Sequence, residues 1–524
     1  MADDRLAADV LVIGGGLAGC WAAIAAARSG ADVVLAEKGY TGTSGVAATA
    51  GPGHWWVPPE PGLREAAVAR RLVAGEGLGE GAWMARIIDL TFRMLPTLTG
   101  YYDFPRNDHG ELQYRALRGP EYLRALRRLA LDCGVRLLDQ SPALELLLHG
   151  DGSVAGARGL GRQTGGEWEV RSGAVILATG GCAFRSRLLG AANNTGDGLL
   201  MAAEAGCGFS GMEFSACYTV APVHTTMTRA MSYAFATYYD QTGRVLPIPR
   251  GPDSSLALAG ALGEGRVYCD LSLMPEDIRR RLPQISPNVM LPFRRLGIDP
   301  FQDRFEITLH GEGTIRGIGG LRIVGEDCRT EVSGLFAAGD VATREPVTGA
   351  VSGGGAVNSA WALSSGHWAG QGAAAHAVMG GVRAGQPAFR IGAAGLRPRH
   401  RRDGVDARSL GEAVQNEMLP PQRALFHTET TLTAMIGRLD GLWDTARDNL
   451  APGGDPAATL RSRETAAMIA AARWCAGSSL ARSESRGMHR RVDCAGRDPD
   501  GPYRVHADGL DRHRTRHVPM ESFA

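Results

Sequence analysis

The chain has 524 residues, of which 56 are basic and 55 acidic, so its formal net charge at neutral pH is only +1. At roughly 150 residues per domain, this length predicts two to four domains with room to bury a large cofactor. The balanced charge gives no electrostatic basis for binding nucleic acid or an anionic membrane.

The nine cysteines include no C-x-x-C pair, so the chain lacks the ligand spacing of a zinc or iron–sulfur centre. Scattered cysteines in odd number favour free thiols in a reducing compartment, and we expect a cytoplasmic protein without a metal site. No apolar run reaches about 18 residues, the length of a membrane span, and no secretory signal is seen. Lys38 is the only lysine, so arginine carries nearly all of the positive charge.

The first predicted elements form a strand, a turn, a helix and a second strand. Residues 10–13 are a continuous aliphatic run, which is typical of a strand buried on both faces of a parallel sheet. Residues 18–29 suit a helix, and residues 33–36 suit the second strand. This order is the start of a βαβ unit.

The turn between the first strand and the helix is a G-x-G-x-x-G motif formed by Gly14, Gly16 and Gly19. In this motif the first glycine makes the turn, the second lets the backbone approach a pyrophosphate, and the third lets helix and strand pack closely. Glu37 ends the second strand, where an acid accepts a hydrogen bond from a ribose hydroxyl. The unit predicts a dinucleotide site.

Further elements follow as far as residue 211. The stretch at 39–56 is rich in glycine and other small residues, which lets backbone lie directly against a ligand. The remaining predicted elements are helical segments at 64–95 and 121–133, a strand at 135–138, a meander at 144–170, a strand at 174–181 that ends in a glycine corner, a polar turn at 194–198 and a helix at 199–205.

The composition changes at about residue 212 and changes back at about 326. Residues 212–325 are aromatic, proline-bearing and irregular, and we interpret them as an inserted α+β domain. The strand-like GLFAAGD and a glycine-rich loop before a long helix then return to the first pattern over 326–382. The dinucleotide domain is therefore predicted to be split into 1–211 and 326–382. A polar linker leads to a mainly helical domain at 405–524 with a β-like tail.

Several short motifs occur in order along the chain: VIGGGLAG, LAEKG, VILATGG, NNTGDG, GLFAAGD and SRGMHRR. Together they resemble the flavoprotein subunits of succinate dehydrogenase and fumarate reductase and their relatives L-aspartate oxidase and adenylylsulfate reductase. The resemblance covers nearly the whole chain. It implies an α/β fold with a split Rossmann-like FAD-binding domain, an inserted α+β capping domain and a C-terminal helical domain. It also implies an FAD-dependent oxidoreductase.

The resemblance assigns a cofactor role to many positions. Val135 would touch the adenine, residues 47–51 would lie against the isoalloxazine, and Asp340 would bind the ribitol or phosphate linkage. The helix beginning near Asn358 would point its N-terminus at the flavin and stabilise the anionic reduced form. The implied FAD-binding residues are Gly14, Gly16, Leu17, Ala18, Gly19, Glu37, Lys38, Ser44, Gly45, Ala47, Ala48, Gly51, Val135, Thr179, Gly180, Gly181, Asn194, Thr195, Asp197, Gly339, Asp340, Asn358 and Ser359.

The chain departs from the family where the flavin link and the substrate are concerned. In membrane-bound members a histidine after a serine links covalently to the flavin, but here Gly45 follows Ser44, so FAD is expected to be non-covalent. Ile315 or Arg316 stands at one family histidine, Tyr218 lies near another, and Ser352 lies near the substrate-clamping arginine. These departures argue against succinate, fumarate or aspartate as substrate.

The candidate catalytic residues are Tyr218, His224, His310, Arg316 and Ser352. Each has a structural alternative, such as a hydrogen-bonded core tyrosine, a surface histidine or a helix cap. We expect hydride transfer between flavin N5 and a carbon of a small organic substrate. The alternatives are an electron-transfer subunit that works with a separate iron–sulfur protein, as in adenylylsulfate reductase, or a flavin-binding regulatory protein. Arg486 and His489 of SRGMHRR are expected to brace a domain junction.

Overall fold

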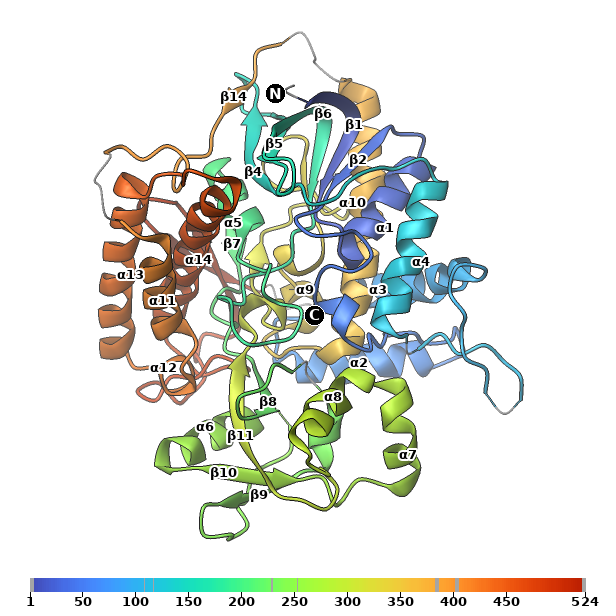
Figure 1. Cartoon of the computed structure of the whole chain (residues 1–524), viewed down its shortest axis with the longest axis vertical. Coiled ribbons are helices and arrows are strands. Elements are labelled where there is room, and N and C mark those ends of the chain that lie inside the picture. The colour runs from blue at the N-terminus through green and yellow to red at the C-terminus, as the bar shows by residue number, and fades with distance from the viewer. Residues whose placement is uncertain are drawn as a thin grey trace.

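A computed structural model describes residues 4–107, 109–115, 117–227, 230–251, 253–381, 386–400 and 405–520. Figure 1 shows a large sheet with helices beside it at the top, a second sheet with helices at the bottom, and a group of helices at one side. Residue 382, the predicted end of the second dinucleotide segment, and residues 521–524 of the predicted C-terminal domain lie outside the described residues.

The largest sheet has the strand order β14-β4-β5-β6-β1-β2-β3, and β13 also pairs with β6. Its centre is parallel: β1 pairs in this sense with β2 and β6, and β13 joins β6. The strands are β1 (Asp4–Ile13), β2 (Val33–Ala36), β3 (Arg136–Leu138), β4 (Ala143–Leu148), β5 (Val154–Leu160), β6 (Glu167–Leu177), β13 (Leu335–Ala337) and β14 (Phe389–Arg390).

Strand β6 is a single element where the sequence suggested the end of a meander and a separate strand. Its residues from Trp168 to Leu177 pair in parallel with β1 from Asp4 to Ile13. The same strand pairs antiparallel with β5 through residues 167–171. Strand β1 is longer than the predicted 10–13 because β6 offers it ladder partners along its whole length.

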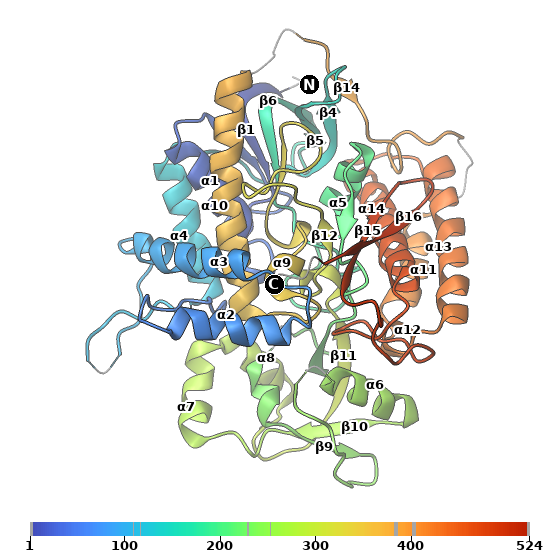
Figure 2. The same ribbon diagram turned by 180° about the vertical axis from the view of Figure 1, so that it is seen from behind.

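Helices α1 (Leu17–Arg28) and α10 (Gly354–Gly380) pack against each other beside this sheet (Figure 2). Small residues allow their backbones to approach: a Cβ on Gly366 would lie 2.4 Å from the Ala18 carbonyl oxygen, and one on Gly370 would lie 2.3 Å from that of Ala22. The long helix begins at Gly354, earlier than the start near Asn358 expected from the sequence.

Other helices surround this core. Helix α4 holds the small-residue stretch: a Cβ on Gly119 would lie 1.9 Å from the Ala47 carbonyl oxygen. The Gly119 N–H donates to the Ala50 carbonyl at 2.9 Å. The helices up to the second sheet are α2 (Leu63–Ala74), α3 (Gly81–Met94), α4 (Gly119–Asp132) and α5 (Asp197–Glu204).

The lower part in Figure 1 is an α+β unit with its own hydrophobic core. Its antiparallel sheet has the order β8-β11-β10-β9. The elements are β8 (Tyr218–Pro222), β9 (Thr237–Asp240), α6 (Ser254–Glu264), β10 (Val267–Asp270), α7 (Glu276–Ile285), α8 (Pro287–Leu296) and β11 (Phe305–Gly311). After this unit the chain returns to the large sheet through β13, so the predicted split α/β fold with an inserted α+β unit is confirmed.

The C-terminal part is mainly helical, as predicted. Its tail returns to a third sheet of order β12-β7-β15-β16. The remaining elements are β7 (Phe209–Ser210), β12 (Gly320–Leu321), α9 (Glu345–Thr348), α11 (Ala407–Met418), α12 (Pro421–Leu425), α13 (Glu429–Asn449), α14 (Pro456–Ala481), β15 (Tyr503–Asp508) and β16 (Arg514–Pro519). Within the described part of the chain, no helix has the length and apolar character needed to cross a membrane.

Candidate functional site

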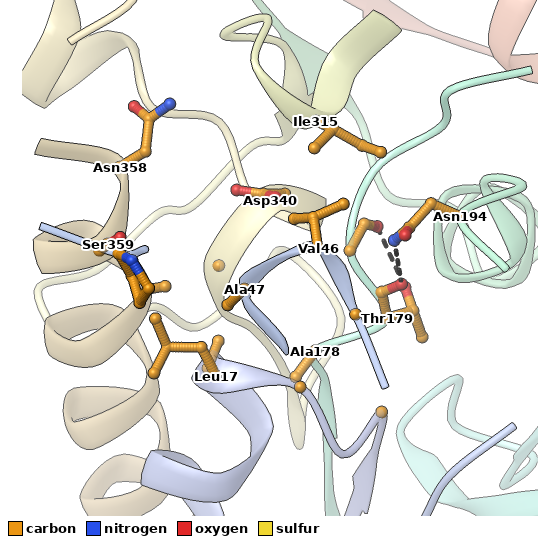
Figure 3. A pocket seen from close by; sticks show the side chains of 18 of the residues that line it. Leu17, Val46, Ala47, Ala178, Thr179, Asn194, Ile315, Asp340, Asn358 and Ser359 are labelled. Carbon is orange, nitrogen blue, oxygen red and sulfur yellow. Dashed lines mark hydrogen bonds between the residues drawn. The ribbon is translucent and has the colours of Figure 1, made fainter. Parts of the chain in front are cut away.

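A cavity of about 670 Å³ opens at the carboxyl ends of the parallel strands. Its wall includes the residues that directly follow these strands: Gly14 after β1, Glu37 after β2, Ala178 after β6, and Gly339 two residues after β13. The carboxyl edge of a parallel sheet is where open α/β folds bind ligands. Figure 3 shows the cavity with the start of α1 and the first turns of α10 facing it.

The three motif glycines have different surroundings. Gly14 has a φ of +107°, and a Cβ there would lie 2.4 Å from the Ala178 carbonyl oxygen. Gly16 lines the cavity, and a Cβ on it would have no atom of the described residues within 4 Å. A Cβ on Gly19 would lie only 1.7 Å from the Gly14 carbonyl oxygen. Gly14 and Gly19 therefore serve the turn and its packing, whereas Gly16 leaves space on the ligand side.

Glu37 is held rigidly at the end of β2. Its side chain is buried, with Oε2 accepting from the Gly15 N–H at 2.5 Å and Oε1 accepting from the Gly39 N–H at 2.7 Å. Because both oxygens are anchored by backbone, the carboxylate is fixed at the cavity wall where a ribose hydroxyl would reach it.

Unpaired polar atoms on the cavity wall match a polar ligand such as FAD. Asn358 is 8% exposed, and within the described part of the chain neither its side-chain oxygen nor its nitrogen has a hydrogen-bond partner; the same holds for the side-chain oxygen of Asn194. Buried polar groups are rarely left without a partner in folded proteins. Together with the helix N-termini at Leu17 and Gly354, which favour anionic groups, these atoms fit a bound dinucleotide.

Most of the predicted FAD-binding residues line this cavity, but several do not. Gly19 is used in packing, and Val135 is buried in the hydrophobic core, while Pro142 and Ala143 line the wall. The predicted residues on the wall are Gly14, Gly16, Leu17, Ala18, Glu37, Lys38, Gly45, Ala47, Gly51, Thr179, Gly180, Asn194, Asp197, Gly339, Asp340, Asn358 and Ser359. Those away from it are Gly19, Ser44, Ala48, Val135, Gly181 and Thr195.

The sequence did not single out every residue on the wall. Some of them follow directly from the predicted glycine-rich segments, but Met201 and Ala230 carried no signal because apolar residues of this kind occur throughout a core. The wall residues not singled out are Ile13, Ala36, Val46, Pro52, Gly53, Pro142, Ala143, Ala178, Asn193, Met201, Ala230, Gly353, Gly354, Gly355, Ala356 and Ala362.

Of the candidate catalytic residues, all of which lie in the described ranges, only Arg316 lines the cavity. Tyr218 is buried on β8, where its hydroxyl donates to the Leu419 carbonyl at 3.3 Å and burial raises its pKa. His224 is exposed and does not reach the cavity. Tyr218 therefore occupies the structural alternative considered for it, as a hydrogen-bonded core tyrosine.

His310 and Ser352 also lie off the cavity. The His310 ring nitrogen Nε2 is 2.9 Å from the Thr225 carbonyl oxygen, and burial lowers its pKa, so the imidazole is neutral at pH 7. Ser352 precedes Gly353 at the rim, where its backbone N–H approaches the Met488 sulfur at 3.2 Å. Neither side chain faces the cavity directly.

Arg316 sits among other charges. Its Nε lies 3.5 Å from Oε2 of the buried Glu312. Asp340, which also lines the cavity, pairs with Arg344; burial raises the pKa of Asp340, while Arg344 and Arg316 partly oppose this rise. Arg344 also donates to the Ile315 carbonyl at 2.9 Å. The turn that carries Arg316 is thus held by Arg344, and Arg316 is one of the residues that line the cavity.

The SRGMHRR motif contacts the loop before α10 through Met488. The Met488 N–H donates to the Ala350 carbonyl at 2.9 Å, and Arg71 of α2 donates to the Thr348 and Val351 carbonyls. Arg486 is bound to Glu484 in the same region, away from the cavity. These contacts hold the loop that leads to the glycine wall at residues 353–355.

Buried histidines make the fold sensitive to acid. Burial lowers the pKa of His54 to about 3, that of His427 to about 4, and that of His489 well below its usual range. Unfolded histidine titrates near pH 6.5, so below this pH the unfolded chain binds protons that the native chain does not. The neutral, buried histidines therefore contribute fully to the free energy of unfolding above pH 6.5. As the pH falls towards 4, this free energy decreases by up to about 1.4 kcal/mol per pH unit for each histidine.

Urea unfolding at pH 7.5, 6.0 and 5.0 measures this effect. The free energy of unfolding should fall over this range, and His54→Gln should flatten the slope because His54 is 4% exposed and glutamine does not titrate. A free energy that stays constant between pH 7.5 and 5.0 would show that these histidines are not buried in the neutral form.

Sequence comparisons agree with the geometry of the cavity. Residues 9–183 match the family described as FAD dependent oxidoreductase, residues 97–357 match FAD binding domain, and residues 410–516 match fumarate reductase flavoprotein C-term. The chain is 26% identical to a subunit of the fumarate reductase (CoM/CoB) of Methanothermobacter marburgensis, over 93% of this chain and 94% of the relative. It is 28% identical to L-aspartate oxidase of Mycobacterium leprae, over 93% and 92%.

Solved structures share the fold. A point mutant of the FrdA chain of E. coli quinol fumarate reductase aligns with a TM-score of 0.83 at 21% identity, covering 99% of this chain and 97% of that one. Adenylylsulfate reductase of Archaeoglobus fulgidus aligns with a TM-score of 0.78 at 17% identity, covering 99% and 96%. At these identities the likeness concerns the fold.

The fold, the cavity and the matched families define an FAD-dependent oxidoreductase. Residues 97–357 belong to the FAD binding domain family and residues 410–516 to the fumarate reductase flavoprotein C-term family, and over more than nine tenths of its length the chain is similar to a fumarate reductase subunit and to L-aspartate oxidase. The resemblance read from the sequence motifs is therefore confirmed.

Proposed function

We propose that the protein holds FAD non-covalently and transfers a hydride between flavin N5 and a carbon of a small organic substrate other than succinate, fumarate or aspartate. The observation that carries this proposal is the position of Arg316 on a cavity wall that also carries Asp340 and many small and apolar residues. The small and apolar residues of this wall include Val46, Ala47, Ala50, Pro52, Ala230, Ile315, Gly353, Gly354, Gly355 and Ala356.

The composition of the wall supports non-covalent binding. Among the described residues that line the cavity there is no histidine, cysteine or tyrosine, the side chains that link covalently to flavins. Gly45 stands on the wall where covalent members of the family carry a histidine. FAD, when bound, supplies the hydride chemistry, and the protein supplies orientation and charge.

The residues at the family's substrate-binding positions support a substrate that is not a dicarboxylate. Ile315 or Arg316 stands at one family histidine position, and neither carries an imidazole; Tyr218, near another, is buried away from the cavity. Ser352, in the neighbourhood of the clamping arginine, also lies off the wall. A guanidinium binds a carboxylate, phosphate or carbonyl oxygen with several N–H donors, so Arg316 would orient a polar group of the substrate while the apolar wall excludes water.

The N-terminus of α10 serves the reduced flavin. Gly353, Gly354 and Gly355 place the first turn of this helix on the wall without side chains in front of its N–H groups. The positive end of a helix dipole favours negative charge. This end would stabilise the anionic reduced flavin and make the oxidised form a better hydride acceptor.

The cysteines support the cytoplasm as the working compartment, because none of the nine, all within the described ranges, forms a disulfide and most are buried. We also keep the segments 1–211 and 326–382, 212–325 and 405–524 as the proposed domain limits. The first two limits enclose the inserted unit, which lies between β6 and β13 of the large sheet, whereas β14 of the same sheet falls between the last two segments.

The proposal is tested with purified protein under anaerobic conditions. Acid denaturation should release FAD into the supernatant, and flavin that stays with the precipitated chain would contradict non-covalent binding. In a screen of small organic acids, ketones and alcohols, a substrate should bleach the flavin absorbance, while succinate and aspartate should leave it unchanged. Bleaching by succinate would overturn the substrate proposal.

The acceptor is distinguished in the same experiment. Rapid reoxidation in air with formation of hydrogen peroxide indicates an oxidase, whereas slow reoxidation indicates a separate acceptor. The second candidate function, electron transfer with a separate iron–sulfur protein, requires slow reoxidation in air. It also requires fast reoxidation when such a protein is added.

A further inference from the structure

The only lysine of the chain lies beside the cavity and is surrounded by oxygen atoms. Lys38 follows β2, and its Nζ is 2.5 Å from Asp197 Oδ2 and 2.7 Å from Glu464 Oε1. The Thr195 hydroxyl and the Asn193 carbonyl oxygen each lie 3.0 Å from the same nitrogen. An arginine could not fit this point-like arrangement, because its donors are spread over a planar fork.

These oxygens can accept all of the hydrogen bonds that the Lys38 ammonium group can donate. A lysine ammonium has three N–H donors, and four oxygens from the described residues already lie within hydrogen-bond distance. Lys38 must therefore give up one of these partners before it can donate to a ligand. Its effect on a bound cofactor must pass through the groups that it holds.

The held segment at residues 193–197 forms part of the cavity wall. Asn193, Asn194 and Asp197 line the cavity, and the Asn194 side chain lies next to Thr179, to whose carbonyl it donates at 3.4 Å (Figure 3). The side-chain oxygen of Asn194, which has no partner among the described residues, is available to a ligand. Fixing this segment through Lys38 fixes the polar groups that it presents.

The remaining partner of Lys38, Glu464, comes from a different part of the molecule. Glu464 belongs to α14, in the C-terminal helical part, and its second oxygen pairs with Arg185. The side chains of Lys38, Asp197 and Glu464 are 13%, 11% and 9% exposed. Burial alone would lower the pKa of Lys38, but Asp197 and Glu464 raise it, so the lysine stays charged. Breaking one partner of such a shielded cluster leaves an uncompensated charge.

We propose that Glu464 is a positioning residue that couples the docking of α14 to the retention of FAD, acting through Lys38 and the segment at 193–197. Such coupling is reciprocal: if docked α14 strengthens FAD binding, bound FAD must stabilise docked α14 by the same factor. The coupling concerns the cofactor site and is independent of the substrate.

Glu464→Gln tests the coupling because it keeps the shape of the side chain and removes its charge. We expect the dissociation constant of FAD, measured by flavin fluorescence during titration of the apoprotein, to rise about tenfold, which corresponds to about 1.4 kcal/mol. Lys38 should also become more reactive towards an amine reagent. Because the chain has no other lysine, peptide mapping reads this labelling at one site.

Glu417→Gln is the matched control. Glu417 is a buried carboxylate of α11, bonded to Arg423 and Arg438 at 2.8 Å, and it does not line the cavity. This variant should lose stability while it keeps the wild-type FAD affinity. An equal loss of FAD affinity in both variants would mean that Glu464 acts only through general stability, and would overturn the proposal.

Hydrogen exchange of the unmodified protein gives a readout that does not depend on a variant. FAD should slow amide exchange more in α14 around residue 464 than in α13, and Glu464→Gln, if it folds, should lose this difference. If FAD slows the two helices equally in the wild-type chain, α14 is not coupled to the cofactor site and the proposal is wrong.

Discussion

Gly16→Ala is expected to leave the fold intact but to weaken FAD binding strongly, whereas Gly19→Ala is expected to damage the fold itself. A Cβ on Gly16 meets no atom of the described residues within 4 Å and points into the space where a pyrophosphate approaches the turn. A Cβ on Gly19 would lie 1.7 Å from the Gly14 carbonyl oxygen, and α1 would have to move away from β1. Overpacking of this kind costs about 1–3 kcal/mol or more.

Two measurements separate these outcomes. The melting temperature of the apoprotein should be unchanged for Gly16→Ala and several degrees lower for Gly19→Ala. The FAD content after gel filtration should fall in both variants, in the first because of the blocked site and in the second because of the displaced helix. A Gly16→Ala protein that keeps its full FAD content would contradict the place given to the pyrophosphate.

Arg316→Ala is expected to lower turnover by about 10²–10³-fold without loss of FAD. An arginine that meets charge or a polar group in a water-poor cavity contributes about 3–4 kcal/mol to the reaction, by analogy with other oriented donors. The side chain is 15% exposed and its turn is held by Arg344, so removal of the guanidinium should not disturb the backbone around it. Steady-state kinetics with the substrate found by flavin bleaching measures the loss.

Arg322→Ala is the control for this experiment. Arg322 follows the same segment, pairs with Glu331 and does not line the cavity. It should retain wild-type turnover, and Arg316→Lys should recover only part of the activity because a lysine cannot offer a planar fork. Full activity of Arg316→Ala would remove Arg316 from the site.

The cofactor half of the site could be predicted from the sequence because its geometry is local. The turn from Gly14 to Gly19 and the acid at Glu37 lie within one βαβ unit, where the spacing of residues fixes their positions in space. Apolar runs likewise predicted the central strands, because strands buried on both faces need continuous aliphatic residues. The helices of the C-terminal part followed from their apolar spacing.

The remaining parts of the site depend on contacts between distant segments. The sequence placed Tyr218 near a catalytic position, but the packing of β8 against the segment around Leu419 turns its hydroxyl away from the cavity. Nothing near Lys38 in the chain indicates Glu464, which lies 426 positions away. Local periodicity carries no information on such pairings, because they are decided by how whole elements dock.

The position of β13 late in the chain affects when FAD can bind during protein synthesis. The cavity is walled by segments as far apart as Ile13 and Ala362, and β13 joins the large sheet only after the inserted unit has been completed. A ribosome adding about 5–20 residues per second therefore releases the first glycine turn well before the opposite wall exists. FAD can therefore bind to the complete cavity only after the chain has been synthesised through α10. Until then, the edge of β6 that pairs with β13 stays without this partner.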